Sequence, residues 1–182
     1  MKSVLISIQP KWCELIASGE KIAEIRKSKP KIYEPFKCYI YETKGIYKPK
    51  GSNHFFQGQG KVVGEFVCGG IKPLMNIAVD NWEHLKGSSF DFEKHIVTDC
   101  ALLTEEELHQ YANGKSCYAW QIEKLLIYDK PKEIFEFYHK KTKISYTTER
   151  NIEGIVHYPK KENVYEPITK PPQSWCYVKE GM

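Results

Sequence analysis

The sequence predicts an α+β fold that is mostly β: a small, partly closed β-barrel flanked by helices. Three observations predict this class. Most segments with regular patterning are short and rich in β-branched and aromatic residues, which is typical of strands. Only two segments have clear helical signals, and strands and helices do not alternate as a parallel βαβ sheet requires. The length of 182 residues suits a single domain over 1–182.

The chain begins with a pattern of strand, helix and turn. Residues 3–9 (SVLISIQ) form a β-branched run that indicates a strand. Pro10 suits the first turn of a helix, where no N–H donor is needed, so a helix is expected over 10–18. Gly19 suits the end of that helix, and a strand is expected over 20–27.

Thr104 gives the clearest helix start. Glu107 follows three residues later, and the pair fits a capping box in which each side chain bonds the backbone N–H of the other residue. A weaker helical pattern covers 74–86. Strands are also expected over 37–44, 61–71 and 174–178, and 116–129 is expected to be one long strand or a bent pair of strands. The remaining expected elements are a basic loop over 45–60 and a proline-started helical turn over 130–140.

Residues 140–170 are polar and lack a clear period. They are interpreted as an insertion into the domain, folded as a loose hairpin. A protein-interaction role for this insertion is one hypothesis for its function.

The charge is unevenly distributed. Residues 1–60 hold 11 Lys and Arg against 5 Asp and Glu, which is 11 − 5 = +6, whereas residues 61–182 hold 16 against 18, which is 16 − 18 = −2. A basic first third favours a phosphate-bearing partner. A solvated lysine-rich surface would give the same composition, so charge alone leaves both interpretations open.

Several classes are not favoured. No apolar run approaches the ~20 residues that span a bilayer, so no membrane association is expected. The first residues lack the pattern of a secretory signal, and a cytoplasmic location is expected. The six cysteines contain no CxxC pair, so we expect reduced thiols, no metal site and no cofactor.

Charged residues crowd into the expected strand that follows Gly19. Lys21, Glu24 and Arg26 complete the pattern G-x-K-x-x-E-x-R. Glu24 and Arg26 would share one face of a strand, with Lys21 at its edge. Such groups are costly to bury unless they pair or bind a ligand. A guanidinium and an ammonium suit phosphate, and a carboxylate can accept from the amine of a nucleobase. A purely structural ion-pair network remains the alternative.

This motif and its setting resemble the ASCH (activating signal cointegrator homology) family, a branch of the PUA-like superfamily. The segments GEFVC, LLTEEELHQYANGKSCYAWQI and PPQSWCYV resemble bacterial and phage members, so that the resemblance covers residues 1–130 and 171–178. It implies a PUA-like barrel with a cleft between the barrel and the first helix. In the family, that cleft is the proposed binding place for RNA or a modified nucleotide.

The resemblance also implies an enzymatic alternative. Some small members are amidohydrolases on N-acylated cytidine, and others are reported as ribonucleases. The working lysine of the amidohydrolases resembles Lys21, while Glu24 stands where they have a threonine nucleophile. Asp99 is the nearest carboxylate ahead of the helix that begins at Thr104. If the protein is an enzyme, Lys21, Glu24 and Asp99 are therefore the expected catalytic residues.

Other candidate ligand-binding residues flank the motif or lie near the C-terminus. Trp12 and Trp175 could stack on a base, although core packing is the commoner role of a tryptophan. The remaining candidates could contact phosphate or donate hydrogen bonds: Lys27, Lys29, Gln173 and Ser174. The leading hypothesis is a binding module for RNA or a modified nucleotide, with the nucleoside amidohydrolase or ribonuclease as the alternative.

Overall fold

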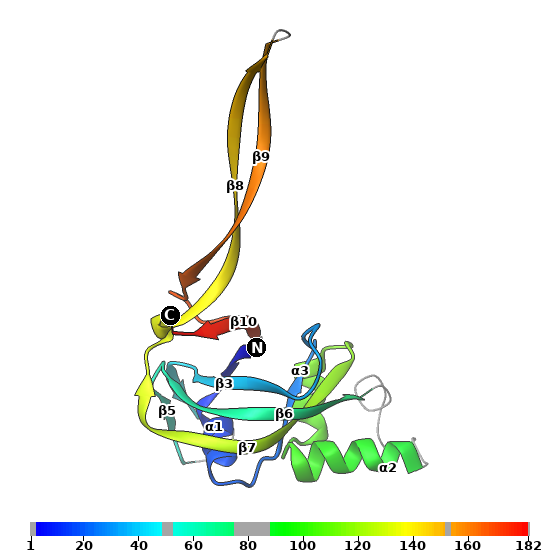
Figure 1. Cartoon of the computed structure of the whole chain (residues 1–182). Coiled ribbons are helices and arrows are strands. Elements are labelled where there is room, and N and C mark those ends of the chain that lie inside the picture. The colour runs from blue at the N-terminus through cyan, green and yellow to red at the C-terminus, as the bar shows by residue number, and fades with distance from the viewer. Residues whose placement is uncertain (1–2, 49–52, 75–87, 152–153, 182) are drawn as a thin grey trace.

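A computed structural model describes residues 3–48, 53–74, 88–151 and 154–181. An eight-stranded sheet forms most of the fold, in the order β2-β7-β6-β3-β1-β10-β8-β9 (Figure 1). The pair β1 and β3 is parallel, and the other neighbours are antiparallel. The strands are β1 (Ser3–Ile8), β2 (Ala23–Arg26), β3 (Phe36–Glu42), β6 (Val62–Leu74), β7 (Cys117–Lys132), β8 (Phe137–Asn151), β9 (Gly154–Pro167) and β10 (Trp175–Glu180).

The predicted fold class is confirmed: the described chain is mostly β with helices, and the sheet is not closed completely into a barrel. None of the helices within the described ranges is long and apolar enough to cross a membrane. The helical elements are α1 (Pro10–Ala17), α2 (Ser88–His95), the π-helical turn η2 (Ile96–Cys100), α3 (Glu105–Ala112) and the 3₁₀ turn η3 (Ile134–Glu136).

Helix α3 begins with the predicted capping box. The backbone N–H of Glu107 donates to Thr104 Oγ1 at 3.1 Å, and the backbone N–H of Thr104 donates to Glu107 Oε2 at 3.0 Å. Asn113, in the left-handed conformation with φ 48°, ends the helix. The capping box therefore fixes where α3 starts, and with it which residues of the helix share a face.

Three expected elements are corrected. The strand expected over 20–27 is shorter, because the N–H of Lys21 still bonds to Leu15 O of the helix end and β2 begins at Ala23. The expected loop over 45–60 contains a small sheet of β4 (Gly45–Tyr47) and β5 (Phe56–Gly58). The helical turn expected over 130–140 is instead the end of β7, η3 and the start of β8.

Strand pairing accounts for the last of these corrections. Phe137 and Tyr138 pair with β10, so the start of β8 gains sheet hydrogen bonds that an isolated helical turn could not provide. The loose hairpin expected within 140–170 is a long regular one, β8 with β9. The helical turns expected over 74–86 fall almost entirely on residues 75–87, outside the described ranges.

Strand β2 is buried on both faces, and this positions the site. Ala23 and Ile25 pack in a core cluster with Val97 and Leu108, from η2 and α3. Since successive side chains of a strand alternate between its faces, the other two residues of β2 point the opposite way. Those residues are charged, and they lie where the fold leaves a cavity rather than more core.

Candidate functional site

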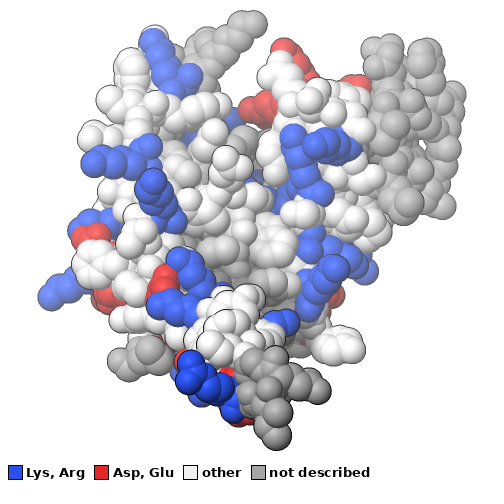
Figure 2. Space-filling view, turned by 90° about the horizontal axis from the view of Figure 1, so that it is seen from above, with Lys and Arg blue, Asp and Glu red and all other residues white. Residues whose placement is uncertain are grey.

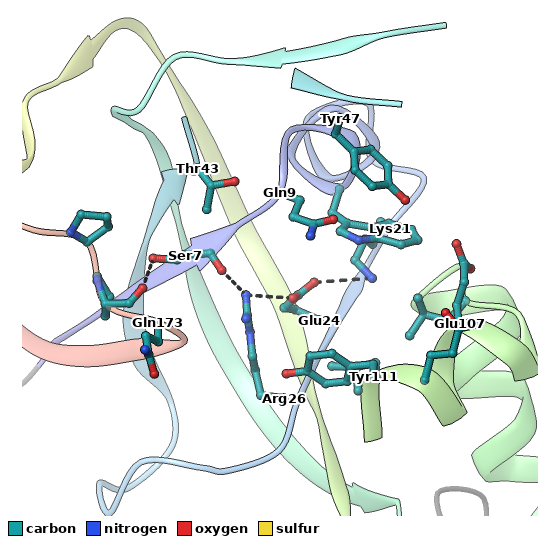
Figure 3. A pocket seen from close by; sticks show the side chains of 16 residues that line it. Ser7, Gln9, Lys21, Glu24, Arg26, Thr43, Tyr47, Glu107, Tyr111 and Gln173 are labelled. Atoms are coloured by element: carbon teal, nitrogen blue, oxygen red, sulfur yellow. Dashed lines mark hydrogen bonds and ion pairs between the residues drawn. The ribbon is translucent and has the colours of Figure 1, made fainter. Parts of the chain in front are cut away.

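A cavity of about 770 Å³ lies at the opposite face of β2 (Figure 3). Its walls come from β1 and β2, the start of α1, the region of β4, the segment before β10, and α3. The lining residues are Ser7, Gln9, Trp12, Lys21, Glu24, Ile25, Arg26, Thr43, Tyr47, Leu103, Glu107, Gln110, Tyr111, Pro171, Pro172 and Gln173.

The Glu24 carboxylate lies between two buried cations. Its Oε1 is 3.0 Å from Arg26 Nη2, and its Oε2 is 3.5 Å from Lys21 Nζ. The three residues are only 6%, 7% and 2% exposed, in the order Glu24, Arg26, Lys21. Ion pairs withdrawn from water to this degree lose much of their hydration, so the Coulombic attraction must be strong to compensate.

Backbone carbonyls complete this network. Lys21 Nζ donates to Ala101 O at 2.5 Å, and Arg26 Nη2 donates to Ser7 O at 2.6 Å. Arg26 Nε is buried and has no hydrogen-bond partner among the described residues. A buried donor without a partner is uncommon in folded proteins, and here it belongs to a side chain that lines the cavity.

Burial lowers the pKa of Lys21 below that of a free lysine, while the adjacent Glu24 carboxylate acts in the opposite direction. The cause is desolvation, which penalises the charged ammonium. Burial likewise raises the pKa of the Tyr111 hydroxyl, and the charge of Arg26 opposes that shift. Both side chains line the cavity, so its wall holds two ionisable groups whose pKa values are shifted by burial.

Aromatic rings and α3 form the other walls. Lys21 Nζ lies 4.8 Å from the centroid of the Trp12 ring, which places a cation against an aromatic face. Glu107 and Tyr111 are four residues apart on α3, hence on one face of the helix. Glu107 Oε1 also pairs with Lys11 Nζ at 3.1 Å, which ties α3 to α1.

The segment before β10 closes the remaining side. The Ser7 hydroxyl donates to Pro172 O at 2.7 Å, and the Ser7 N–H donates to Ser174 O at 2.9 Å. Ser7 therefore contacts both this segment and Arg26. As a result, residues far apart in the chain meet at one end of β1.

Five of the sequence-predicted candidates line the cavity together: Trp12, Lys21, Glu24, Arg26 and Gln173. The others are not among the lining residues. Lys27 and Lys29 are exposed, with their Nζ atoms 5.1 Å from the Tyr111 ring centroid and 5.9 Å from the Tyr118 ring centroid.

Ser174, Trp175 and Asp99 also lie outside the lining. Trp175 packs against Trp120, with ring centroids 5.9 Å apart, and its Nε1 donates to Ser28 Oγ. Asp99 is on η2, where its exposed carboxylate bonds to His95 Nδ1 at 2.7 Å. The side-chain bonds from Thr98 and His95 lower the pKa of Asp99.

The sequence pattern did not predict several of the lining residues. Tyr111 and Glu107 could have been found, because the capping box fixed the start of the helix and their i, i+4 spacing put them on one face. Tyr47 had no local signal, since it reaches the cavity only through the pairing of β4 with β5. No group of three or more His, Cys, Asp or Glu side chains in the described ranges is arranged to hold a metal ion.

Comparison with known proteins identifies the family. The ASCH domain family model matches residues 6–143, which include β2, α3 and most of the cavity lining. This chain belongs to the ASCH family. The ASCH domain is a branch of the PUA-like superfamily, which is related to RNA-binding domains.

Solved structures of an ASCH protein from Zymomonas mobilis are similar to this chain at low identity. The unmutated protein gives a TM-score of 0.48 at 16% identity, covering 72% of this chain and 73% of the other. One single-site variant of it gives 0.47 at 17%, covering 74% and 77%. A second gives 0.46 at 16%, covering 72% and 73%. A search of curated proteins found no match.

The lowered pKa of Lys21 predicts a pH dependence of stability. Between the pKa of folded Lys21 and the free value of 10.5, the unfolded chain binds more protons than the folded one, so unfolding free energy rises with pH. Lys21→Met removes the amine. We expect the free energy of unfolding of the wild type, relative to Lys21→Met, to increase as pH rises toward 10.5, measured by urea denaturation.

Lys37→Met is the matched control, because Lys37 pairs with Glu65 outside the cavity and is partly exposed. A difference between wild type and Lys21→Met that stays constant or shrinks with rising pH would contradict the buried, desolvated state of the Lys21 ammonium.

Proposed function

We propose that this ASCH domain binds RNA or a modified nucleotide, with one nucleotide entering the cavity. The observation that carries the proposal is the buried network of Lys21, Glu24 and Arg26 at the cavity wall. If the network served only stability, we would expect other side chains to pack against it on all sides. This one instead borders an open space.

The size of the cavity supports a small ligand or a single residue of a polymer. Its volume of about 770 Å³ lies within the range of small-molecule sites, roughly 300–1,000 Å³. A nucleotide fits such a space, whereas a nucleic-acid helix does not. A base within a longer RNA would therefore enter only when unstacked, as single-stranded and looped bases can.

The charges suit a nucleotide. The network has two cations for one carboxylate, so a phosphate or another anion can balance the second cation. Arg26 Nε is a donor without a protein partner. The Glu24 carboxylate has lone pairs beyond the two ion pairs and can accept from an exocyclic amine such as that of cytosine.

Neutral side chains around the network supply the other contacts that a base requires. Trp12, Tyr47 and Tyr111 line the cavity from three elements and offer aromatic faces for stacking. The amide side chains of Gln9 and Gln173 also line it and can both donate and accept. Figure 3 shows Gln9, Tyr47, Tyr111 and Gln173 around the Lys21, Glu24 and Arg26 network.

Charge outside the cavity suits the rest of an RNA chain. Lys and Arg outnumber Asp and Glu on the face seen in Figure 2, where they lie on both sides of a hollow. Lys27 and Lys29 directly follow β2 and are exposed. Cations at such positions attract the phosphates that flank a bound base, and salt weakens that attraction.

Removing both cations is expected to abolish binding. In a Lys21→Ala, Arg26→Ala variant, Glu24 loses both ion-pair partners and the ligand loses both positive charges. We expect cytidine 5′-monophosphate and single-stranded RNA to bind the wild type, with affinity that falls as salt is added, and not the variant. Isothermal titration calorimetry measures the affinity for cytidine 5′-monophosphate, and fluorescence anisotropy measures the affinity for single-stranded RNA and its salt dependence.

The control variant Lys37→Ala, Lys132→Ala loses the same charge at two ion pairs outside the cavity lining. Gln173→Ala leaves the buried network intact, so its effect on binding does not depend on the stability of that network. Salt-independent binding, or equal loss of affinity in the control and cavity variants, would contradict the proposal.

Hydrolysis of an acylated nucleoside or of RNA is the second candidate. It is favoured by one observation: burial lowers the pKa of Lys21, and a lysine so shifted beside a carboxylate can take part in proton transfer. In that case Lys21 would stabilise developing negative charge, and Glu24 would orient or deprotonate the attacking water.

The two candidates differ in a turnover assay. We expect purified protein to leave N-acetylcytidine and single-stranded RNA intact, as a binding module does, when products are followed by chromatography. Release of acetate or of RNA fragments that is lost in Glu24→Gln would favour the hydrolase. Turnover that Glu24→Gln leaves unchanged would remove Glu24 from the mechanism.

A further inference from the structure

The hairpin of β8 and β9 has two faces whose residues are fixed by strand register. Its strands pair residue for residue, from Tyr138 opposite Pro167 to Asn151 opposite Gly154. Directly opposed residues of an antiparallel pair lie on the same face, and successive residues alternate. We call the face with the even-numbered residues of β8 face A, and the other face B.

Face B is electrically balanced. It carries Lys141, Lys143 and Lys160, together with three glutamates. Lys141 Nζ and Lys143 Nζ lie 2.6 and 3.2 Å from the Glu166 carboxylate, and Lys160 Nζ lies 2.8 Å from Glu162 Oε1. Each lysine on this face therefore has a carboxylate partner.

Face A has cations and no carboxylate. Its charged residues are Lys140, Arg150 and Lys161, and none of its described members is Asp or Glu. Within the described part of the chain, none of these three cations forms an ion pair. Both faces thus have three lysines or arginines, but only face A leaves that charge uncompensated.

Exposed apolar and aromatic side chains lie between the cations of face A. Ile144, Tyr146, Ile155 and Tyr165 are 54%, 66%, 55% and 41% exposed. A two-stranded ribbon has no second layer to cover such groups. Figure 1 shows that most of the hairpin projects away from the rest of the fold. Tyr165, near its base, has Lys179 Nζ of β10 at 5.3 Å from its ring centroid, which adds a cation beside this face.

We propose that face A is a second contact surface for single-stranded RNA, separate from the cavity. Charge complementarity selects a polyanion, because cations without carboxylates recur along the face. The interleaved tyrosines select an unpaired strand, whose bases can stack on aromatic rings, over a duplex. The proposal rests on the proposed function only in taking RNA as the partner.

The length and connection of the hairpin suit this role. The 14 residues of β9 extend about 46 Å at ~3.3 Å per residue, which is long enough to follow several nucleotides. After Pro167, the Ile168 N–H bonds to Phe137 O, and the chain reaches the cavity lining at Pro171. One strand of RNA could therefore contact face A while a nucleotide of it enters the cavity.

The test compares two variants of equal charge. The face A variant is Lys140→Gln, Arg150→Gln, Lys161→Gln, and the probe is fluorescein-labelled oligouridine of about 20 nucleotides. We expect at least a tenfold loss of affinity by fluorescence anisotropy. We also expect the slope of log affinity against log salt to become shallower by about 2, at ~0.7 per contact for single strands.

The matched control is the face B variant, Lys141→Gln, Lys143→Gln, Lys160→Gln, which loses the same charge from the same hairpin. We expect its affinity for oligouridine to stay within about threefold of the wild type. Both variants should bind cytidine 5′-monophosphate as the wild type does, since neither alters the cavity. The experiment therefore distinguishes a failure of the proposal for face A from a failure of the proposal that the cavity binds a nucleotide.

A second matched pair of variants tests whether bases stack on the tyrosines of face A. Tyr146→Ser on face A should weaken oligouridine binding several-fold, and Tyr158→Ser on face B should not. Equal effects of the two charge variants, or no binding of oligouridine by the wild type, would overturn the proposal. So would a Tyr146→Ser variant that keeps its RNA affinity but loses self-association in ultracentrifugation, which would assign face A to a protein contact.

Discussion

The site depends on the ion pairs that the Glu24 carboxylate forms with Lys21 and Arg26. Among the residues that the structure describes, this is the one carboxylate within ion-pair distance of Lys21 and Arg26, and all three groups are almost fully buried. Removing one partner of a buried pair leaves an uncompensated charge, which typically costs about 3–5 kcal/mol. The two cations also bond Ala101 O and Ser7 O, so the network joins the chain after η2 to β1 through β2.

This arrangement explains why charged residues occupy such a short strand. Ala23 and Ile25 hold β2 in the core beneath α3, and strand alternation then directs its other two side chains to the cavity. Packing on one face thus positions charge on the other. Since a buried ion pair is often no more stabilising than apolar residues of similar size, its presence at a cavity fits a ligand better than it fits stability.

The parts of the fold that the sequence predicted are those with local signals. Thr104 with Glu107 gave the start of α3, and Gly19 gave the end of α1, because capping depends on residues a few positions apart. Lys21 was expected at a strand edge, yet it precedes β2, since its N–H completes the end of the helix through Leu15 O. The exact boundary depends on whether a backbone N–H bonds to the helix end or to a neighbouring strand, and the residue pattern does not determine which of the two forms.

The candidate site was predictable in part for the same reason. The spacing from Lys21 to Arg26 brought three lining residues together, whereas Ser7 and Tyr47 reach the cavity only through contacts between distant segments. The two faces of the hairpin likewise depend on register. Polar composition alone indicated an insertion, and only the pairing of β8 with β9 separates the balanced face from the basic one.

A crystal structure of the protein with cytidine 5′-monophosphate tests the central claim most directly. The account predicts the nucleotide in the cavity, with hydrogen bonds from its base or phosphate to Glu24 and Arg26 and with an aromatic ring of the wall against the base. An unoccupied cavity in crystals grown with saturating nucleotide, or a nucleotide bound elsewhere with the Glu24 network untouched, would contradict it.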